Sequence, residues 1–207
     1  DERIWGCLLG GAIGDAVASP HEGTRGKKLD LVTDPDEYAN RWQLTDDTQL
    51  TLATCQALVR TGVNPEGIAN SFLEWYRGRR LRGLGASTLK ALRDLDAGCP
   101  WPPAGRGGEF AAGNGAAMRV APLAFCLDPQ SVADRRTLRD ICRITHHHEE
   151  AYLGALAVVL ALQPGASLES ITQELPDSRV RDNVLELRRL PAGSRLGEAA
   201  ARVVGHV

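Results

Sequence analysis

One segment of the sequence joins a run of oxygen-bearing side chains to a helical pattern, Thr45 to Val59 (TDDTQLTLATCQALV). The apolar residues that follow its acidic start recur at helical spacing and predict a buried helix face: Leu50, Ala53, Ala57 and Leu58. Thr45 suits an N-cap, and Asp46 and Asp47 complement the helix dipole, so a purely structural interpretation is open. The alternative is that the hydroxyl and the two carboxylates converge on one hard cation.

Composition limits the classes of protein to which the chain can belong. Its 207 residues, 43% hydrophobic and 24% charged, predict one globular domain over residues 1–207. A net charge of −2 argues against a nucleic-acid binder, which needs a clustered basic face. The five cysteines form no CxxC pair, which favours free thiols in a reducing, cytoplasmic compartment. No charged n-region precedes an apolar run with a cleavage site, and no apolar run approaches about 18 residues without a charge, so neither secretion nor membrane insertion is expected.

Helical patterns recur along the chain, and none of the segments alternates as a strand would, so we predict an all-α fold, a compact multi-helix bundle. Besides the segment from Thr45 to about Gly62, helices are expected over 4–18, 65–76, 83–97, 131–144, 151–162, 167–175, 179–190 and 195–204. Asn64 and Ser131 are expected N-caps, and Gly62 is an expected C-cap. Residues 23–44 show no sustained period and predict a long connection.

The first predicted helix, 4–18, is rich in glycine. Gly6, Gly10, Gly11 and Gly14 each cost roughly 1 kcal/mol of helix propensity, so we expect them to permit close contact with another helix. Asp15 interrupts the apolar pattern near the end of this helix, and Pro20 closes it.

The segment Ala111 to Phe125 (AAGNGAAMRVAPLAF) predicts a small-residue turn, Gly113 to Gly115, that opens a helix. Such a turn exposes backbone N–H groups that suit a phosphate or a sugar hydroxyl, although it is also an ordinary connection. A side chain added at Gly115 is expected to project toward a ligand. Met118 is by itself a typical core residue.

Three consecutive histidines, His146 to His148, do not have the i, i+4 spacing of a helical zinc site. We expect one of them to face a ligand and the other two to be solvated.

Four motifs together resemble the ADP-ribosylglycohydrolase family, in the same order and over nearly the whole chain: GCLLGGAIGDAVASPHE, LTDDTQL, GNGAAMRVAPL and THHHEEAYLGAL. The resemblance implies a helical bundle with two divalent cations, Mg²⁺ or Mn²⁺. It makes Thr45, Asp46 and Asp47 the metal ligands, and it places Glu22 with Asp46 and Asp47 in the catalytic group. The implied ADP-ribose contacts are Gly113, Asn114, Gly115, Met118 and His146.

The activity implied by this resemblance is metal-dependent hydrolysis of the glycosidic bond between ADP-ribose and a modified protein side chain or small molecule. The alternative is a non-catalytic member that binds ADP-ribose or has a structural role, as the family's jellyfish lens crystallins do. Ala18 stands where relatives commonly have Gly, and the chain stops at Val207, before a second acidic motif that completes the family's metal site. We therefore expect a C-terminally truncated domain that binds metal weakly, turns over poorly and exposes an apolar patch.

Overall fold

The computed structural model describes residues 2–21 and 43–191, and it confirms the all-α prediction. The α-helices are α1 (Glu2–Ala18), α3 (Asp46–Thr61), α4 (Pro65–Arg77), α5 (Ala86–Asp96), α6 (Val132–Arg143), α7 (Glu149–Ala161), α8 (Leu168–Glu174) and α9 (Arg179–Arg188). Short 3-10 helices are η1 (Ser19–His21), η2 (Glu109–Ala111), η3 (Ala117–Arg119) and η4 (Ala121–Phe125). Within the described ranges, strand structure is limited to β1 (Arg106–Gly107) and β2 (His146–His147), which pair in parallel.

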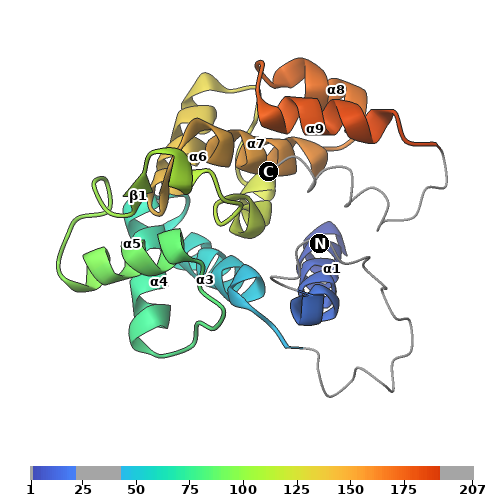
Figure 1. The fold of residues 1–207 in the computed structure, drawn as a ribbon. Coiled ribbons are helices and arrows are strands. Elements are labelled where there is room, and N and C mark those ends of the chain that lie inside the picture. Colours follow the sequence, from blue (N-terminus) through green and yellow to red (C-terminus); the bar gives the residue numbers. More distant parts are fainter. Residues whose placement is uncertain (1, 22–42, 192–207) are drawn as a thin grey trace.

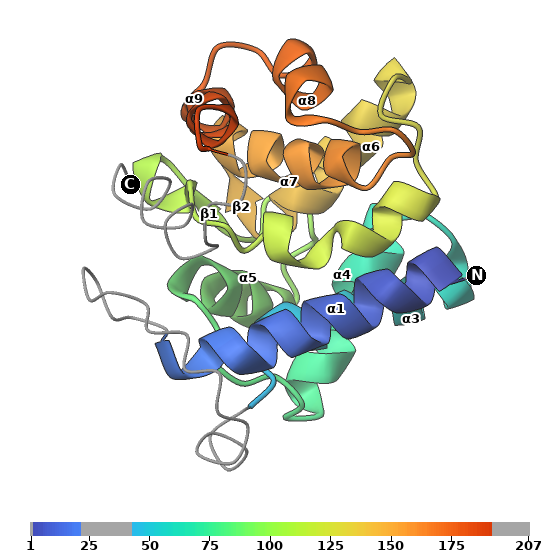
Figure 2. The same cartoon turned by 90° about the vertical axis from the view of Figure 1, so that its right-hand side faces the viewer.

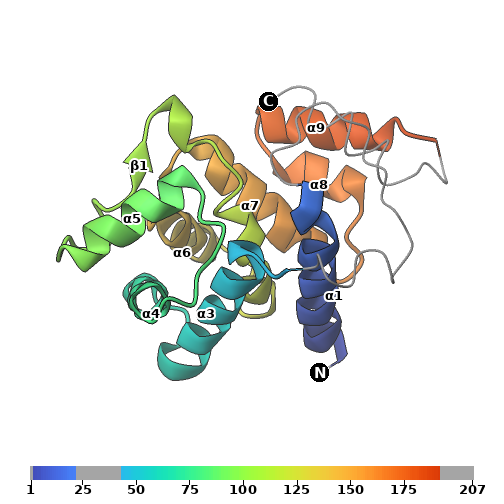
Figure 3. The ribbon, with the colours of Figure 1, turned by 60° about the horizontal axis from the view of Figure 1, so that its bottom comes forward.

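The helices pack in successive pairs around a central non-α segment. Helix α4 packs between α3 and α5, while α6 packs on α7, and α8 and α9 cover α7 (Figure 1). The 3-10 helices η3 and η4 contact both α3 and α7 and so connect the two halves of the bundle (Figure 2). Helix α1 lies beside α3, as Figure 3 shows.

The core forms where the apolar helix faces meet. Leu50 and Ala53 of α3 are fully buried, in the cluster that also holds Phe72 of α4 and Leu123 of η4. Helix α7 contributes buried residues from nearly all of its faces, as a helix enclosed by neighbours should. Among the described helices, none has the length and the apolar character that a membrane span requires.

Four of the predicted helix ends are confirmed by their capping residues. Thr45 is the N-cap of α3, Asn64 caps α4 with Pro65 in the first turn, and Ser131 caps α6. Gly62 ends α3 with φ 69°, a conformation that glycine adopts without a Cβ penalty.

Residues 111–125 depart from the predicted helix. They form 3-10 segments rather than an α-helix, because a continuous helix from Gly115 would place Pro122 in its interior. The predicted helix 195–204 lies outside the described residues, as does most of the predicted connection 23–44.

The expectation of close packing on the α1 glycines is wrong within the described part of the chain. A Cβ built on Gly6, Gly10, Gly11 or Gly14 would have no atom within 4 Å, so no neighbour requires these glycines. Helix α1 also leaves Trp5, Leu9 and Ile13 65%, 56% and 61% exposed. The apolar pattern of this segment therefore predicted the helix correctly, but the outer face of the helix is exposed.

Candidate functional site

A buried carboxylate on α1 fixes the start of α3. Asp15 is 9% exposed, and its Oδ1 accepts a hydrogen bond from Oγ1 of Thr45 at 2.7 Å. Its Oδ2 accepts from the Thr45 amide at 2.9 Å and from the Thr48 hydroxyl and amide at 2.6 and 3.3 Å. Sequence reasoning missed this role, although an acid inside the apolar pattern of α1 was its signal.

The three predicted metal ligands stand at the N-terminal end of α3. Thr45 and Asp46 are buried at 8% and 7% exposure, whereas Asp47 is half-buried. The Thr45 hydroxyl also accepts a hydrogen bond from the Asp47 amide at 3.3 Å, as an N-cap does. The structural interpretation of this segment is therefore correct, and it leaves the cation interpretation open.

The donor set at this helix start suits a hard cation. A hydroxyl and two carboxylates are the oxygen ligands that Mg²⁺ and Mn²⁺ prefer, and the described residues near them supply no thiolate or imidazole pair for zinc. No group of three His, Cys, Asp or Glu side chains that could hold a metal occurs within residues 2–21 and 43–191. Glu22, the further predicted acid, lies outside the described residues.

The glycine turn packs its inner side against His146. Gly113 and Asn114 are exposed and Gly115 is buried. A Cβ built on Gly115 would lie 2.5 Å from Cε1 of His146 and 3.1 Å from Oγ1 of Thr88. The expectation that a side chain at Gly115 points toward a ligand is therefore wrong, because that direction leads into the core.

The three histidines all have structural partners, and His147 and His148 are half-buried rather than fully solvated. His146 is 4% exposed, and its Nδ1 lies 2.7 Å from Oγ1 of Thr145. Nε2 of His147 lies 2.5 Å from the Ala104 carbonyl oxygen, and His148 caps α7. Burial, together with the charge of Arg119 and with His147, lowers the pKa of His146 to about 3, so the ring is neutral.

Arg119 joins the glycine turn to the C-terminal end of α6. Its guanidinium is fully buried, and it donates hydrogen bonds to the carbonyl oxygens of Gly115 and Ile141. It also lies over the Phe72 ring, 5.0 Å from the centroid. Burial lowers the pKa of Arg119 to about 10, while the nearby Cys142 and Asp46 act in the opposite direction, so the side chain stays cationic at neutral pH.

Met118 connects the segment after the glycine turn to α3 through its backbone. Its side chain is half-buried, and its carbonyl oxygen accepts a hydrogen bond from Oγ1 of Thr51, on α3, at 3.2 Å. The structure thus brings the segments 45–51 and 113–119 together, although more than 60 residues separate Thr51 from Met118.

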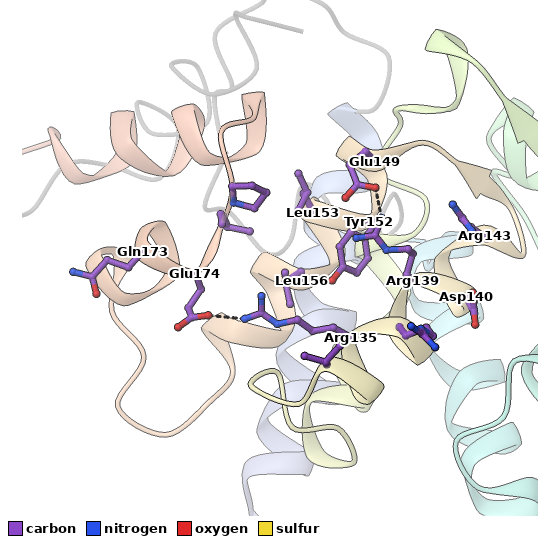
Figure 4. A pocket seen from close by; sticks show the side chains of 14 residues that line it. Arg135, Arg139, Asp140, Arg143, Glu149, Tyr152, Leu153, Leu156, Gln173 and Glu174 are labelled. Carbon is purple, nitrogen blue, oxygen red and sulfur yellow. Dashed lines mark hydrogen bonds and ion pairs between the residues drawn. The ribbon is translucent and has the colours of Figure 1, made fainter.

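Two cavities formed by described residues can be compared with the predicted site residues. The smaller, of about 240 Å³, adjoins the start of α3 and is lined by Ser19, Pro20, Gln43, Leu44, Thr45, Arg82 and Gly83. The larger, of about 760 Å³, lies between α6, α7 and α8 and contains none of the predicted site residues (Figure 4). Its Arg135 and Arg139 form ion pairs with Glu174 and Glu149. Of the two cavities, only the smaller is lined by a predicted site residue, Thr45.

Comparison with known proteins gives a consistent result. The family model described as ADP-ribosylglycohydrolase matches residues 1–206. The chain is 31% identical to an uncharacterised protein of Archaeoglobus fulgidus over 171 residues, covering 78% of this chain and 55% of that protein. It is 31% identical to the ADP-ribosylhydrolase ARH3 of Homo sapiens over 196 residues, covering 84% of this chain and 53% of that enzyme.

A bacterial relative and a solved structure extend the comparison. The ADP-ribosylarginine hydrolase Tri1 of Pseudomonas putida is 28% identical over 209 residues, covering 94% of this chain and 56% of that protein. A chain in a structure titled "ADP-ribosylglycohydrolase-related protein complex" superposes with a TM-score of 0.66 at 26% identity, covering 97% of this chain and 79% of that one. The chain spans about half the length of the curated relatives it matches. Fold, motifs and sequence matches agree, and this chain belongs to the ADP-ribosylglycohydrolase family.

Proposed function

We propose that the protein is a metal-dependent hydrolase that cleaves the glycosidic bond between ADP-ribose and a modified protein side chain or small molecule. The names of two relatives, an ADP-ribosylhydrolase and an ADP-ribosylarginine hydrolase, support this class of substrate. We further propose a cytoplasmic location, which the five free cysteines of the sequence support.

The observation that carries the proposal is the connection between the acidic start of α3 and the glycine turn. Thr51 of α3 donates to the Met118 carbonyl oxygen, and η3 packs on α3, while buried Arg119 donates to the Gly115 carbonyl oxygen. Two segments with different chemistry, one suited to a cation and one to a phosphate or sugar, therefore lie next to each other.

Each segment has a definite role in this proposal. Thr45, Asp46 and Asp47 would hold Mg²⁺ or Mn²⁺, because hydroxyl and carboxylate oxygens are hard ligands. The bound ions would supply a polarised water or sugar hydroxyl for attack at the anomeric carbon, where positive charge develops. Asp46, Asp47 and Glu22 would orient that water and accept its proton.

The glycine turn would supply the ADP-ribose contacts. Gly113 and Asn114 are its exposed residues, so their backbone is accessible to a diphosphate or a ribose hydroxyl. Gly115 and His146 lie behind them on the core side, and Met118, further along the same segment, is half-buried. Gly115 and His146 would therefore contribute mainly by holding the turn in place.

The test compares Asp47→Asn with Glu66→Gln in the full gene product that contains these 207 residues. Both substitutions neutralise an acid in the first turn of a helix, α3 in one case and α4 in the other, so they cost similar helix-dipole energy. Mn²⁺ affinity and ADP-ribose release from an ADP-ribosylated arginine substrate are measured, with circular dichroism as the check on folding.

We expect Asp47→Asn to abolish hydrolysis with unchanged helical dichroism and Glu66→Gln to behave as the parent. Retained hydrolysis in Asp47→Asn would remove the metal assignment. A parent protein that binds ADP-ribose without releasing it from the substrate would support the non-catalytic alternative.

A further inference from the structure

Within residues 2–21 and 43–191, Asp15 makes four hydrogen bonds, all of them to Thr45 and Thr48. We propose that Asp15 is a positioning residue for cation binding, which holds the Thr45 hydroxyl so that its proton points away from the cation and a lone pair faces it. This inference rests on the proposed function, since it requires a divalent cation at the start of α3.

The bonding capacity of the Thr45 hydroxyl supports this orientation. A hydroxyl has one proton to donate and two lone pairs to accept. Oγ1 of Thr45 donates its proton to Oδ1 of Asp15 at 2.7 Å and accepts from the Asp47 amide at 3.3 Å. One lone pair remains, and a cation binds a hydroxyl through a lone pair. The hydroxyl is therefore already in the state that a ligand to a cation requires.

Burial keeps the pair in this arrangement. Asp15 and Thr45 are 9% and 8% exposed, so water competes little for either group. The other oxygen of Asp15 accepts from the Thr48 hydroxyl at 2.6 Å and from the Thr45 and Thr48 amides at 2.9 and 3.3 Å. These three bonds prevent the carboxylate from rotating away from the Thr45 hydroxyl.

The division of bonds between the two oxygens makes Asp15→Asn a selective variant. An asparagine whose amide oxygen takes the Oδ2 position keeps three of the four bonds. Its NH₂ group then takes the Oδ1 position and donates to Oγ1 of Thr45 instead of accepting from it. Both lone pairs of Oγ1 would be occupied, and the hydroxyl proton would turn toward the cation.

The experiment measures Mn²⁺ affinity by calorimetry in the full gene product, for the parent, Asp15→Asn and Thr48→Val. Loss of an outer-shell partner typically weakens metal binding about 10- to 100-fold, and we expect a loss of that size in Asp15→Asn. Thr48→Val is the matched control, because it removes a hydrogen bond to the same carboxylate without touching the Thr45 pair. We expect it to lower the melting temperature and to weaken Mn²⁺ binding far less than Asp15→Asn, because the two amide bonds to Oδ2 and the Thr45 pair remain.

A third variant tests whether Asp15 acts through Thr45. In a Thr45→Val background there is no hydroxyl to orient, so Asp15→Asn should cause no further loss of Mn²⁺ affinity. A further loss as large as in the parent would overturn the inference. Equal Mn²⁺ affinity of the parent and Asp15→Asn would also overturn it while the proposed function stands. A parent that binds no Mn²⁺ would instead overturn the cation site of the proposed function, and this role of Asp15 with it.

Discussion

Gly115 faces His146 so closely that a Cβ on the glycine would lie 2.5 Å from Cε1 and 3.0 Å from Nε2 of the ring. The ring has little room to move, because it is 4% exposed and is paired with Thr145. The absence of a side chain at Gly115 is thus a packing requirement of the candidate site. The histidine supports the glycine turn from behind.

We expect Gly115→Ala to lower the free energy of unfolding by about 1–3 kcal/mol, the usual cost of overpacking a core. Gly113→Ala is the control, because its Cβ would lie 3.6 Å from Nε2 of His146, an ordinary contact, and should cost less than about 0.5 kcal/mol. Chemical denaturation measures both. In a His146→Ala background the cost of Gly115→Ala should shrink, and an unchanged cost there would contradict the packing explanation.

The contrast between Thr45 and Gly115 shows how much of the site was accessible from sequence. The cap at Thr45 depends on neighbours in the sequence, and local propensity predicted it correctly. The direction of Gly115 depends on His146, and the partner of Asp15 lies 30 residues further along the chain. Such contacts are set by tertiary packing, which helical periodicity does not encode.

Tertiary packing also limited how much of the fold could be predicted. Buried helix faces were predicted well because apolar spacing reports them directly, as with Leu50 and Ala53 of α3. The 3-10 segments at 117–125 were missed because small residues permit several tight turns, and Pro122 decides between them only in context. The family resemblance supplied the site residues that no local pattern could assign.

The neutral state of His146 predicts a pH dependence of stability. Its pKa is lowered to about 3 from the 6.5 of a free imidazole, so the unfolded chain binds more protons between these values. The stabilisation from the neutral ring is fully present above pH 6.5 and is lost as the pH falls toward 3. In this window His146 should reduce the free energy of unfolding by up to roughly 1.4 kcal/mol per pH unit.

Urea unfolding from pH 7 to pH 4 measures this slope, with His146→Gln as the comparison. The parent should lose stability more steeply than His146→Gln as the pH falls, because the variant lacks the titrating ring. NMR of the imidazole should show the ring still neutral at pH 5. Identical slopes, or a ring that protonates near pH 6.5, would refute the assignment.

We expect the substitution Arg119→Lys to destabilise the protein. Its fork donates to the Gly115 and Ile141 carbonyl oxygens, and an ammonium group cannot reproduce that planar geometry. Leaving one buried carbonyl without a donor costs about 1–3 kcal/mol, and Arg119→Lys should lower the free energy of unfolding by that amount. Arg136→Lys on the exposed side of α6 is the matched control and should leave stability unchanged. Equal stability of the two variants would mean that the fork of Arg119 does not support the turn.

The exposed apolar face of α1 predicts dye binding and self-association, and both can be measured on the chain of 207 residues. Trp5, Leu9 and Ile13 are spaced by four residues, so they form one stripe, and each is more than half exposed. We expect this chain to bind a hydrophobic dye or to self-associate, since contiguous apolar patches do both.

Replacing the three stripe residues by glutamine, a good helix former, should remove most of the dye fluorescence and most of the association seen by light scattering, with α1 retained. Val59→Gln on α3 is the control, because Val59 is 88% exposed but does not belong to the stripe, and it should change neither signal. Dye binding that survives the triple substitution would locate the responsible surface away from α1. Loss of the signal in the Val59 variant as well would show that the signal depends on exposed apolar residues in general rather than on this stripe.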